Sequence, residues 1–275
     1  MKIIQITDTH LSHLKPHFQE NWKPLVDWVN AMGPDLVVHT GDLTVDGADM
    51  EEDLIHGREM LRDLRYPTLC VPGNHDIGDM PGTRQPVDDE RLSRWRRIIG
   101  PDRWVHDLGE WRLVGLNSLI VGSGNSEEHE QLVWLEDTLR TRAGRRVLVF
   151  KHKPLFVEDP EEGETGYWGM LPEPRRQLYT LFAEHGVELV ASGHLHRARI
   201  VDGALFRCVW GPSSGFTVGP MVTMPVGDVF LGAAVHTLGS TVESSIISLA
   251  TLKPFVIDDV LNEVYPPTPT EASLS

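Results

Sequence analysis

The sequence predicts an α/β fold in which two sheets pack as a layered sandwich. Short apolar runs alternate with amphipathic segments near the start of the chain, a rhythm that is typical of a parallel sheet covered by helices. Between residues 198 and 249, apolar runs are separated by glycine and proline turns without a helical pattern, which indicates a second sheet packed on the first. The 275 residues are enough for one large domain, which we expect to cover residues 1–265, with 198–252 as its strand-rich part.

The first part of the chain predicts three strands that alternate with helices. Apolar runs indicate strands at residues 2–6, 36–38 and 68–71. Amphipathic spacing indicates helices at residues 22–32, 50–64 and 92–99. In a sheet of this kind the functional crevice lies outside the carboxyl ends of the strands.

The remaining elements are read from the same patterns. Residues 104–117 predict a β-hairpin whose turn is Gly109-Glu110. Further strands are expected at 147–150 and 187–191, and further helices at 130–142 and 175–185. Residues 266–275 combine prolines with small polar residues, and we expect them to form a disordered tail.

The net charge of the chain limits its partners. Lysine and arginine number 25 against 40 aspartates and glutamates, which gives a formal net charge of -15. Non-specific binding to a nucleic acid backbone needs a cationic face, so we expect no nucleic acid polymer as a partner. A small phosphorylated substrate stays compatible with this charge, because a bound cation can invert the local field of a site.

Cysteine usage and the start of the chain predict a cytoplasmic protein. Cys70 and Cys208 both lie in apolar runs, and we expect them to be buried thiols in a reducing compartment. The chain opens directly into a strand followed by Asp8, which leaves no room for a cleavable signal peptide. The most apolar region, residues 216–238, is interrupted by glycine, proline and aspartate, so we expect no membrane insertion.

Polar side chains that can bind metal follow five of the predicted strands. Asp8 and His10 stand two residues apart, so both can face one ion, and His194 and His196 repeat this spacing. The complete ligand set consists of Asp8, His10, Asp42, Asn74, His152, His194 and His196. None is a thiolate, which suits Mn²⁺, Fe²⁺ or Fe³⁺, Zn²⁺ or Co²⁺. Seven ligands exceed what one catalytic ion needs and suit two ions that share a bridging carboxylate and a bridging water.

Each of these residues has a simpler interpretation on its own. A single histidine is more often a core or surface group, and we interpret His39 and the other remaining histidines in this way. Asp42 could cap a helix or a turn, and residues 72–76 could be a turn with polar side chains. Chemistry is favoured because all of the ligand-type groups fall at the same edge of the predicted sheet.

The order of these motifs resembles the calcineurin-like metallophosphoesterase superfamily. The matching elements, between residues 8 and 196, are Asp8-x-His10, Gly41-Asp42, Gly73-Asn74-His75-Asp76, His152 and Gly193-His194-x-His196. The resemblance implies a four-layer α/β/β/α sandwich with two packed mixed sheets. It also implies a metal-binding hydrolase with a binuclear metal centre, in which a hydroxide that bridges the two ions attacks phosphorus.

The resemblance further implies a role for each motif residue. One ion would be held by Asp8, His10 and His196, the other by Asn74, His152 and His194, and Asp42 would bridge the two. His75 would be the catalytic acid beside the phosphate, helped by Asp76, and Asn74 and His75 would contact the substrate. Such an acid can stabilise developing charge or protonate the leaving oxygen.

The sequence differs at two positions from protein serine/threonine phosphatases of this superfamily, and both differences bear on the substrate. Protein serine/threonine phosphatases carry an arginine soon after the bridging aspartate and a glutamate where Asp76 stands, whereas residues 42–47 contain no arginine. Both differences disfavour protein phosphatase activity. The compact size and the turn Lys151-His152-Lys153-Pro154 resemble bacterial class III cyclic nucleotide phosphodiesterases and glycerophosphodiesterases. We therefore expect hydrolysis of small phosphodiesters, with 3',5'-cyclic AMP as the named candidate.

The same metal centre would also serve other esters. A phosphomonoesterase, a phospholipid or glycerophosphodiester hydrolase, and a nucleotide-sugar pyrophosphatase are the alternatives. A metal-dependent scaffold without turnover is disfavoured, because no ligand of the motif set is lost.

Two further residues and one surface are candidates for contacts. Arg84, in the polar loop 78–90, could help hold a phosphate, and Trp168 could stack on a base. The alternatives are a solvated cation and a packed core tryptophan. The strands expected between residues 216 and 249 are more apolar than a solvent-facing sheet needs, which could mark a homodimer surface or an ordinary core.

Overall fold

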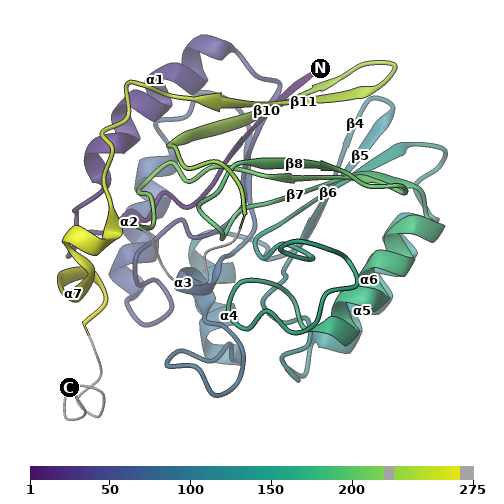
Figure 1. Cartoon of the computed structure of the whole chain (residues 1–275), viewed down its shortest axis with the longest axis horizontal. Coiled ribbons are helices and arrows are strands. Elements are labelled where there is room, and N and C mark those ends of the chain that lie inside the picture. Colours follow the sequence, from purple (N-terminus) through teal and green to yellow (C-terminus); the bar gives the residue numbers. More distant parts are fainter. Residues whose placement is uncertain (220–225, 267–275) are drawn as a thin grey trace.

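The structure of the chain is a computed structural model that describes residues 1–219 and 226–266. These residues form two mixed sheets that pack face to face with helices on both outer sides, as Figure 1 shows. This α/β/β/α sandwich confirms the predicted fold class. The prediction of a disordered tail falls outside the described residues except for Pro266.

The first sheet is built around the amino-terminal strand. Its order is β11-β10-β1-β2-β3. The strands are β1 (Lys2–Ile6), β2 (Leu36–His39), β3 (Thr68–Cys70), β10 (Gly232–Leu238) and β11 (Val242–Ser248). β1, β2 and β3 are parallel, whereas β10 and β11 add in antiparallel orientation. The assignment of residues 198–249 to a second sheet was therefore wrong for β10 and β11, because a strand pattern does not tell which edge the strand will join.

The second sheet has the order β4-β5-β6-β7-β9-β8. Its strands are β4 (Trp104–Leu108), β5 (Trp111–Leu116), β6 (Arg146–Lys151), β7 (Val187–Ser192), β8 (Arg199–Asp202) and β9 (Arg207–Trp210). β4 and β5 form the predicted hairpin. β5, β6, β7 and β9 are parallel neighbours, and β4 and β8 close the two edges in antiparallel orientation.

The helices cover the outer face of each sheet. The longer ones are α1 (Trp22–Met32), α2 (Glu51–Leu61), α4 (Asp89–Ile98), α5 (Glu128–Arg140) and α6 (Pro172–Glu184). The short ones are η1 (Gln19–Asn21), α3 (Asn74–Ile77), η2 (Ile257–Asp259) and α7 (Leu261–Val264). α4 and α6 begin earlier than predicted. Asp88 caps α4 by accepting from the backbone of Arg91 at 2.8 Å, and a proline in the first turn suits the start of α6.

Alternation along the strands divides the core into layers. Ile3 and Val38 point between the two sheets, where they pack with Leu148 and Leu189 of the second sheet. Their neighbour Ile4 points the other way and packs under α1. A third cluster joins the second sheet to α5 and α6. The period of two along each strand therefore supplies both an inner core and two outer cores.

Polar side chains also connect the two sheets. The amide of Gln5 in β1 donates to the carbonyl of Ser192 in β7 at 2.9 Å, and the indole of Trp104 in β4 donates to the carbonyl of Cys70 in β3 at 2.8 Å. All four residues are buried. These bonds hold the ends of strands from both sheets beside one another.

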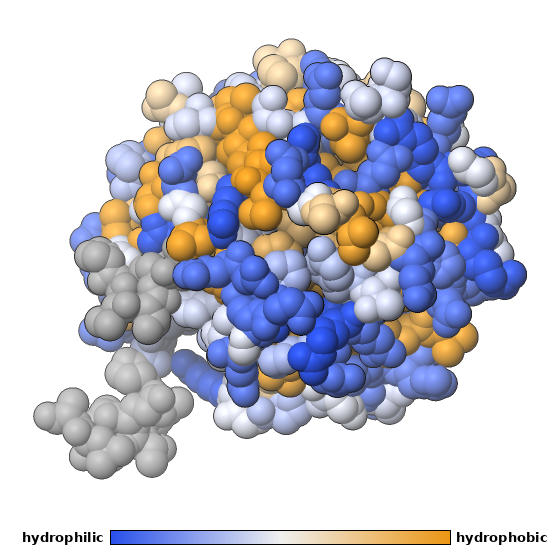
Figure 2. Space-filling model, turned by 45° about the vertical axis from the view of Figure 1, so that its right-hand side comes forward, coloured by the Kyte–Doolittle hydropathy of each residue, from blue (hydrophilic) through white to orange (hydrophobic). Residues whose placement is uncertain are grey.

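The surface has mixed hydropathy, and both cysteines lie inside the protein. On the face shown in Figure 2, hydrophilic residues cover much of the lower half and hydrophobic residues gather in smaller groups. Cys70 and Cys208 are free and buried, as predicted. Within the described residues, no helix has the length and apolar character that crossing a membrane requires. The homodimer surface and the single-domain assignment stay predictions.

Replacing Trp104 by phenylalanine tests the bond between the sheets. The change removes the indole donor and leaves the buried carbonyl of Cys70 unpaired, so we expect the free energy of unfolding to fall by about 1–3 kcal/mol. Urea denaturation measures this change. The control is Trp28→Phe, which alters a half-buried tryptophan on α1 away from the contact between the sheets. An equal loss in both variants would contradict the role of the bond.

Candidate metal centre

The predicted ligands converge where the two sheets meet. The first sheet supplies Asp8, His10, Asp42 and Asn74 from the ends of β1, β2 and β3, and the second supplies His152, His194 and His196 from the ends of β6 and β7. The Nε2 atom of His152 lies 3.1 Å from Oδ1 of Asn74 and 3.3 Å from Oδ2 of Asp42. On the other side, the Nε2 atoms of His10 and His196 are 3.3 Å apart. Each of the seven side chains therefore lies against another member of the set.

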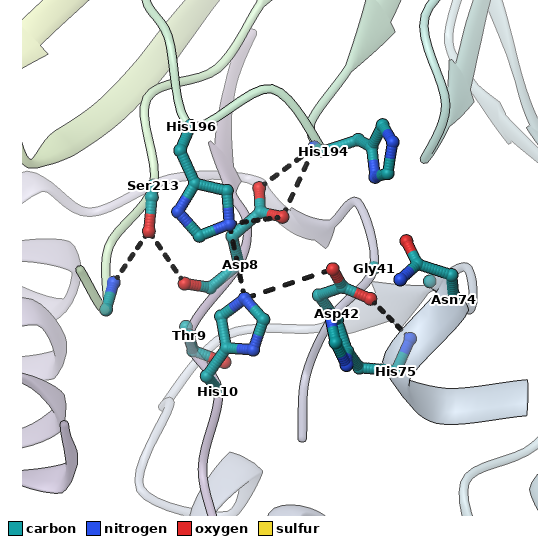
Figure 3. A network of polar contacts seen from close by, with 12 residues as sticks. Asp8, Thr9, His10, Gly41, Asp42, Asn74, His75, His194, His196 and Ser213 are labelled. Carbon is teal, nitrogen blue, oxygen red and sulfur yellow. Dashed lines mark hydrogen bonds and ion pairs between the residues drawn. The ribbon is translucent and has the colours of Figure 1, made fainter. Parts of the chain in front are cut away.

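The ligands divide into two groups that share one carboxylate. Asp8, His10, Asp42 and His196 form one group, and Asp42, His152 and His194 form the other, with ligand atoms in each group within 4.8 Å of one another. Asn74 joins the second group through its contact with His152. Figure 3 shows Asp42 between His10 on one side and Asn74 on the other. This arrangement fits two ions with Asp42 as the shared ligand.

The backbone at the ligands is unusual. Six residues other than glycine have a positive φ among the described residues, and five of them are Asp8, His10, Asp42, His194 and His196, with φ between 45° and 70°. This left-handed conformation costs about 1–2 kcal/mol for a residue with a side chain. Its concentration on the predicted ligands indicates a site that the rest of the fold holds in place.

Two motif glycines allow the loops to approach closely. A Cβ atom at Gly73 would lie 2.2 Å from both the backbone nitrogen and Oδ1 of Asp42. A Cβ atom at Gly193 would lie 2.0 Å from the hydroxyl of Thr7 and 2.7 Å from Oδ2 of Asp8. These glycines are needed because another loop fills the space of their missing side chain.

Hydrogen bonds orient three of the four ligand histidines. Nδ1 of His152 lies 2.8 Å from the carbonyl of Thr40, Nε2 of His194 lies 2.9 Å from the carbonyl of Tyr167, and Nδ1 of His196 lies 2.8 Å from the carbonyl of Phe216. A carbonyl only accepts, so these nitrogens carry the hydrogens. The other nitrogen of each ring is then left with the lone pair that a metal ion needs.

Burial sets the charge state of the ligands. Burial raises the pKa of Asp8 to about 7, and the neighbouring carboxylate of Asp42 adds to the shift. Burial also lowers the pKa of His196 to about 4 and that of His10 well below its ordinary value. His152 differs, because the neighbouring carboxylate of Asp42 raises its pKa to about 9 despite its burial. Neutral imidazoles at His10 and His196 beside crowded carboxylates are a ligand set that bound cations would stabilise, so the residues present fit a metal centre.

Asp76 lies behind the ligands. Its carboxylate accepts hydrogen bonds from the backbone nitrogens of Gly73, Leu43 and Thr44 at 2.9 to 3.1 Å and from the hydroxyl of Thr44 at 2.8 Å. These contacts join the turn after β3 to the loop after β2. The structure therefore places Asp76 as a support of the loops, and any help to His75 is indirect.

His75 lies beside the ligands at a half-buried position. Its backbone nitrogen donates to Oδ1 of Asp42 at 2.9 Å, and its ring centre is 5.1 Å from that of His10. Its ring also stacks on Tyr265, with centres 4.6 Å apart. The side chain that was predicted as the acid is thus held next to the shared ligand.

The two predicted substrate contacts are placed differently. Trp168 is half-buried, packs against the core under the second sheet, and has its ring centre 6.3 Å from that of His194. It lies near the ligands, although it also serves as the packed tryptophan of the alternative interpretation. The exposed guanidinium of Arg84 donates to the carbonyl of Pro266 at 3.0 Å, so this contact holds it against the end of the described chain.

Sequence reasoning missed several residues that contact the ligands or their immediate neighbours in the chain. His39, interpreted as a core or surface histidine, accepts from the backbone of Gly41 at 3.3 Å and lies 2.9 Å from the hydroxyl of Thr9. The signal in the sequence that could have identified His39 is its position two residues before the motif Gly41-Asp42. The hydroxyl of Tyr167 accepts from the amide of Asn74 at 2.9 Å, and that of Tyr265 lies 3.1 Å from Nδ1 of His10. No motif marks either tyrosine.

The chain is similar in sequence to several known enzymes. The chain is 32% identical to the serine/threonine-protein phosphatase CPPED1 of Bos taurus over 49% of this chain and 43% of that protein. It is 31% identical to the 3',5'-cyclic adenosine monophosphate phosphodiesterase CpdA of Escherichia coli K12, over 55% of this chain and 54% of that protein. It is 28% identical to the probable glycerophosphodiester phosphodiesterase GpdQ of Arcobacter nitrofigilis, over 72% of both chains. The match thus spans about half the length of the first two relatives.

A solved structure and a protein-family model also match this chain. The structure of a dimetal phosphatase from Danio rerio has the same fold, with a TM-score of 0.56, 15% identity, and coverage of 90% of this chain and 99% of that one. The family model described as calcineurin-like phosphoesterase matches residues 1–198, which contain all seven predicted ligands. The chain therefore belongs to the calcineurin-like phosphoesterase family.

Proposed function

We propose that the chain is a hydrolase of small phosphodiesters that depends on two metal ions, with 3',5'-cyclic AMP as the first substrate to test. The observation that carries the proposal is the pair of buried ligand groups that share Asp42. Carboxylate, amide and imidazole ligands suit Mn²⁺, iron or Zn²⁺. The chemistry that such a pair supplies is Lewis acidity toward the phosphoryl oxygens and a lowered pKa of water.

The residues of the chain position the substrate and handle the proton. Asp42 is held by the backbone of His75 through one oxygen and faces His152 through the other, so its carboxylate cannot turn away. The half-buried imidazole of His75 lies beside His10, where it can donate a proton to the leaving oxygen. Asn74, which precedes it, has its amide oxygen toward His152 and its amide nitrogen toward Tyr167.

Two observations favour a phosphodiester as the substrate. Relatives that cover more than half of this chain are named as a cyclic nucleotide phosphodiesterase and a probable glycerophosphodiester phosphodiesterase. Residues 42–47 also lack the arginine expected of protein serine/threonine phosphatases. The CPPED1 relative, whose name states a phosphatase, is a specific reason to keep phosphomonoester hydrolysis as the second candidate.

Asp42→Ala should abolish activity and lower the amount of bound metal, because the side chain belongs to both ligand groups. Metal content of the purified, Mn²⁺-treated protein and its turnover of a phosphodiester measure both effects. Asp27→Ala is the matched control, since Asp27 is an exposed carboxylate on α1 that pairs only with Lys23 among the described residues. A fully metallated and active Asp42→Ala protein would refute the two-ion centre.

His75→Ala should slow turnover by roughly 10²–10⁴-fold and leave metal content nearly unchanged, because His75 acts as a proton donor outside the two ligand groups. Steady-state kinetics and metal analysis of the same preparation separate the two effects. His129→Ala changes an exposed histidine on α5 and should match the wild type. Loss of metal on removal of His75 would instead make it a ligand.

The substrate class is tested by comparing three esters on the Mn²⁺-loaded protein. We expect faster hydrolysis of bis(p-nitrophenyl) phosphate and 3',5'-cyclic AMP than of p-nitrophenyl phosphate. The Asp42→Ala protein serves as the blank for contaminating phosphatases. Activity confined to p-nitrophenyl phosphate would keep the metal centre and replace the diester by a monoester.

A further inference from the structure

The fourth ligand histidine is oriented differently from the other three. His152, His194 and His196 each place one ring nitrogen on a backbone carbonyl. His10 instead places Nδ1 3.1 Å from the hydroxyl of Tyr265, a side chain that lies 255 residues further along the chain. The orientation of this ligand therefore depends on the carboxyl-terminal segment.

The segment that carries Tyr265 is fixed to the body of the protein. Ile257 and Val264 are buried in a cluster with Phe18, Val45 and Phe216. The backbone of Thr217 donates to the carbonyl of Phe255 at 2.9 Å, and the backbone of Ile257 donates to the carbonyl of Thr217 at 3.0 Å. The ammonium of Lys15 donates to the carbonyl of Val264 at 2.7 Å.

Tyr265 also contacts the proposed acid. Its ring stacks on that of His75 with an angle of 30° between the planes and 4.6 Å between the centres. His10 and His75 are themselves in edge contact, with centres 5.1 Å apart. One tyrosine thus lies against both a ligand of the first ion and the side chain proposed to handle the proton.

We propose that Tyr265 is a positioning residue of the active site, which orients His10 through its hydroxyl and His75 through its ring. Nε2 of His10 faces Nε2 of His196 and lies 3.9 Å from Oδ2 of Asp42, so this is the nitrogen that would bind an ion. Nδ1 then carries the hydrogen and donates it to the oxygen of Tyr265. This inference rests on the proposed function, because it assigns the roles of ligand and acid to His10 and His75.

The second ligand group has a comparable tyrosine. The hydroxyl of Tyr167 accepts from the amide nitrogen of Asn74, which turns the amide oxygen toward His152. The ammonium of Lys153 lies 5.5 Å from the centre of the Tyr167 ring and pairs with Asp79 at 2.8 Å. Tyr167 lies within the region that the family description covers, whereas Tyr265 lies outside residues 1–198.

Tyr265→Phe tests the hydroxyl, because it removes the contact with His10 and keeps the ring. Partners that orient metal ligands typically contribute 10- to 100-fold to affinity. We expect the variant to bind one of two Mn²⁺ ions about 10- to 100-fold more weakly, as measured by competition with a chromophoric chelator. Tyr66→Phe is the matched control, since it removes a hydroxyl that lies near Asn30 and away from the ligands.

Tyr265→Ala tests the ring. With Mn²⁺ at saturating concentration, Tyr265→Phe should recover the kcat of the wild type. Tyr265→Ala should stay about 2- to 10-fold slower, because His75 has lost its aromatic partner. Thermal unfolding of both variants checks that the fold is retained.

The outcomes separate this inference from the proposed function. If the wild type binds two ions and Tyr265→Phe binds both with unchanged affinity, the positioning role is overturned while the metal centre stands. The same holds if Tyr265→Ala and Tyr265→Phe have equal kcat at saturating metal. A wild type that binds no pair of ions would overturn the proposed function and the inference with it.

Discussion

The face-to-face packing of the two sheets is the constraint on which the active site depends. Neither sheet contains a complete ligand group, because His10 of the first sheet needs His196 of the second and Asn74 needs His152. The inner apolar core sets the distance between the sheets, and the bonds from Gln5 and Trp104 connect them through polar contacts. A small change in this packing would move ligands from different sheets relative to each other, so the core contributes directly to the chemistry.

The left-handed backbone of the ligands shows how the fold holds the site. Five such residues at about 1–2 kcal/mol each amount to a large part of the roughly 5–15 kcal/mol by which a typical domain is stable. The loops are held by backbone bonds from Asp8 to Gly41 and from His10 to Asp42, at 3.0 and 3.1 Å. The carboxylate of Asp76 accepts four further hydrogen bonds from these loops. This explains why a carboxylate stands in the motif at a position that does not face the ions.

The convergence of the predicted ligands could be read from the sequence because each of them follows the end of a strand. A short apolar run followed by Asp8-x-His10 or His194-x-His196 contains both the strand and the chemistry, and the parallel sheet brings the ends together. The sheet that β10 would join could not be predicted, because strands of both sheets show the same apolar pattern. Tyr167 and Tyr265 were missed for a related reason. Their roles arise from contacts between distant segments, and nothing in their sequence neighbourhood distinguishes them from ordinary tyrosines.

The separation between local motif residues and contacts from distant segments bears on why relatives of this chain are named for different substrates. The seven ligands all belong to the two buried groups around Asp42, where they can act only on the phosphoryl group that every phosphoester shares. In the proposed function the rest of an ester would lie outside them, and Tyr167, which is 45% exposed, and Trp168 are the nearby aromatic side chains that it could contact. Tyr265 approaches from the opposite side of the ligands, through His10 and His75. The proposed function therefore assigns the choice between a diester and a monoester to these aromatic residues and their loops, and it assigns to the motif residues the reaction that both classes have in common.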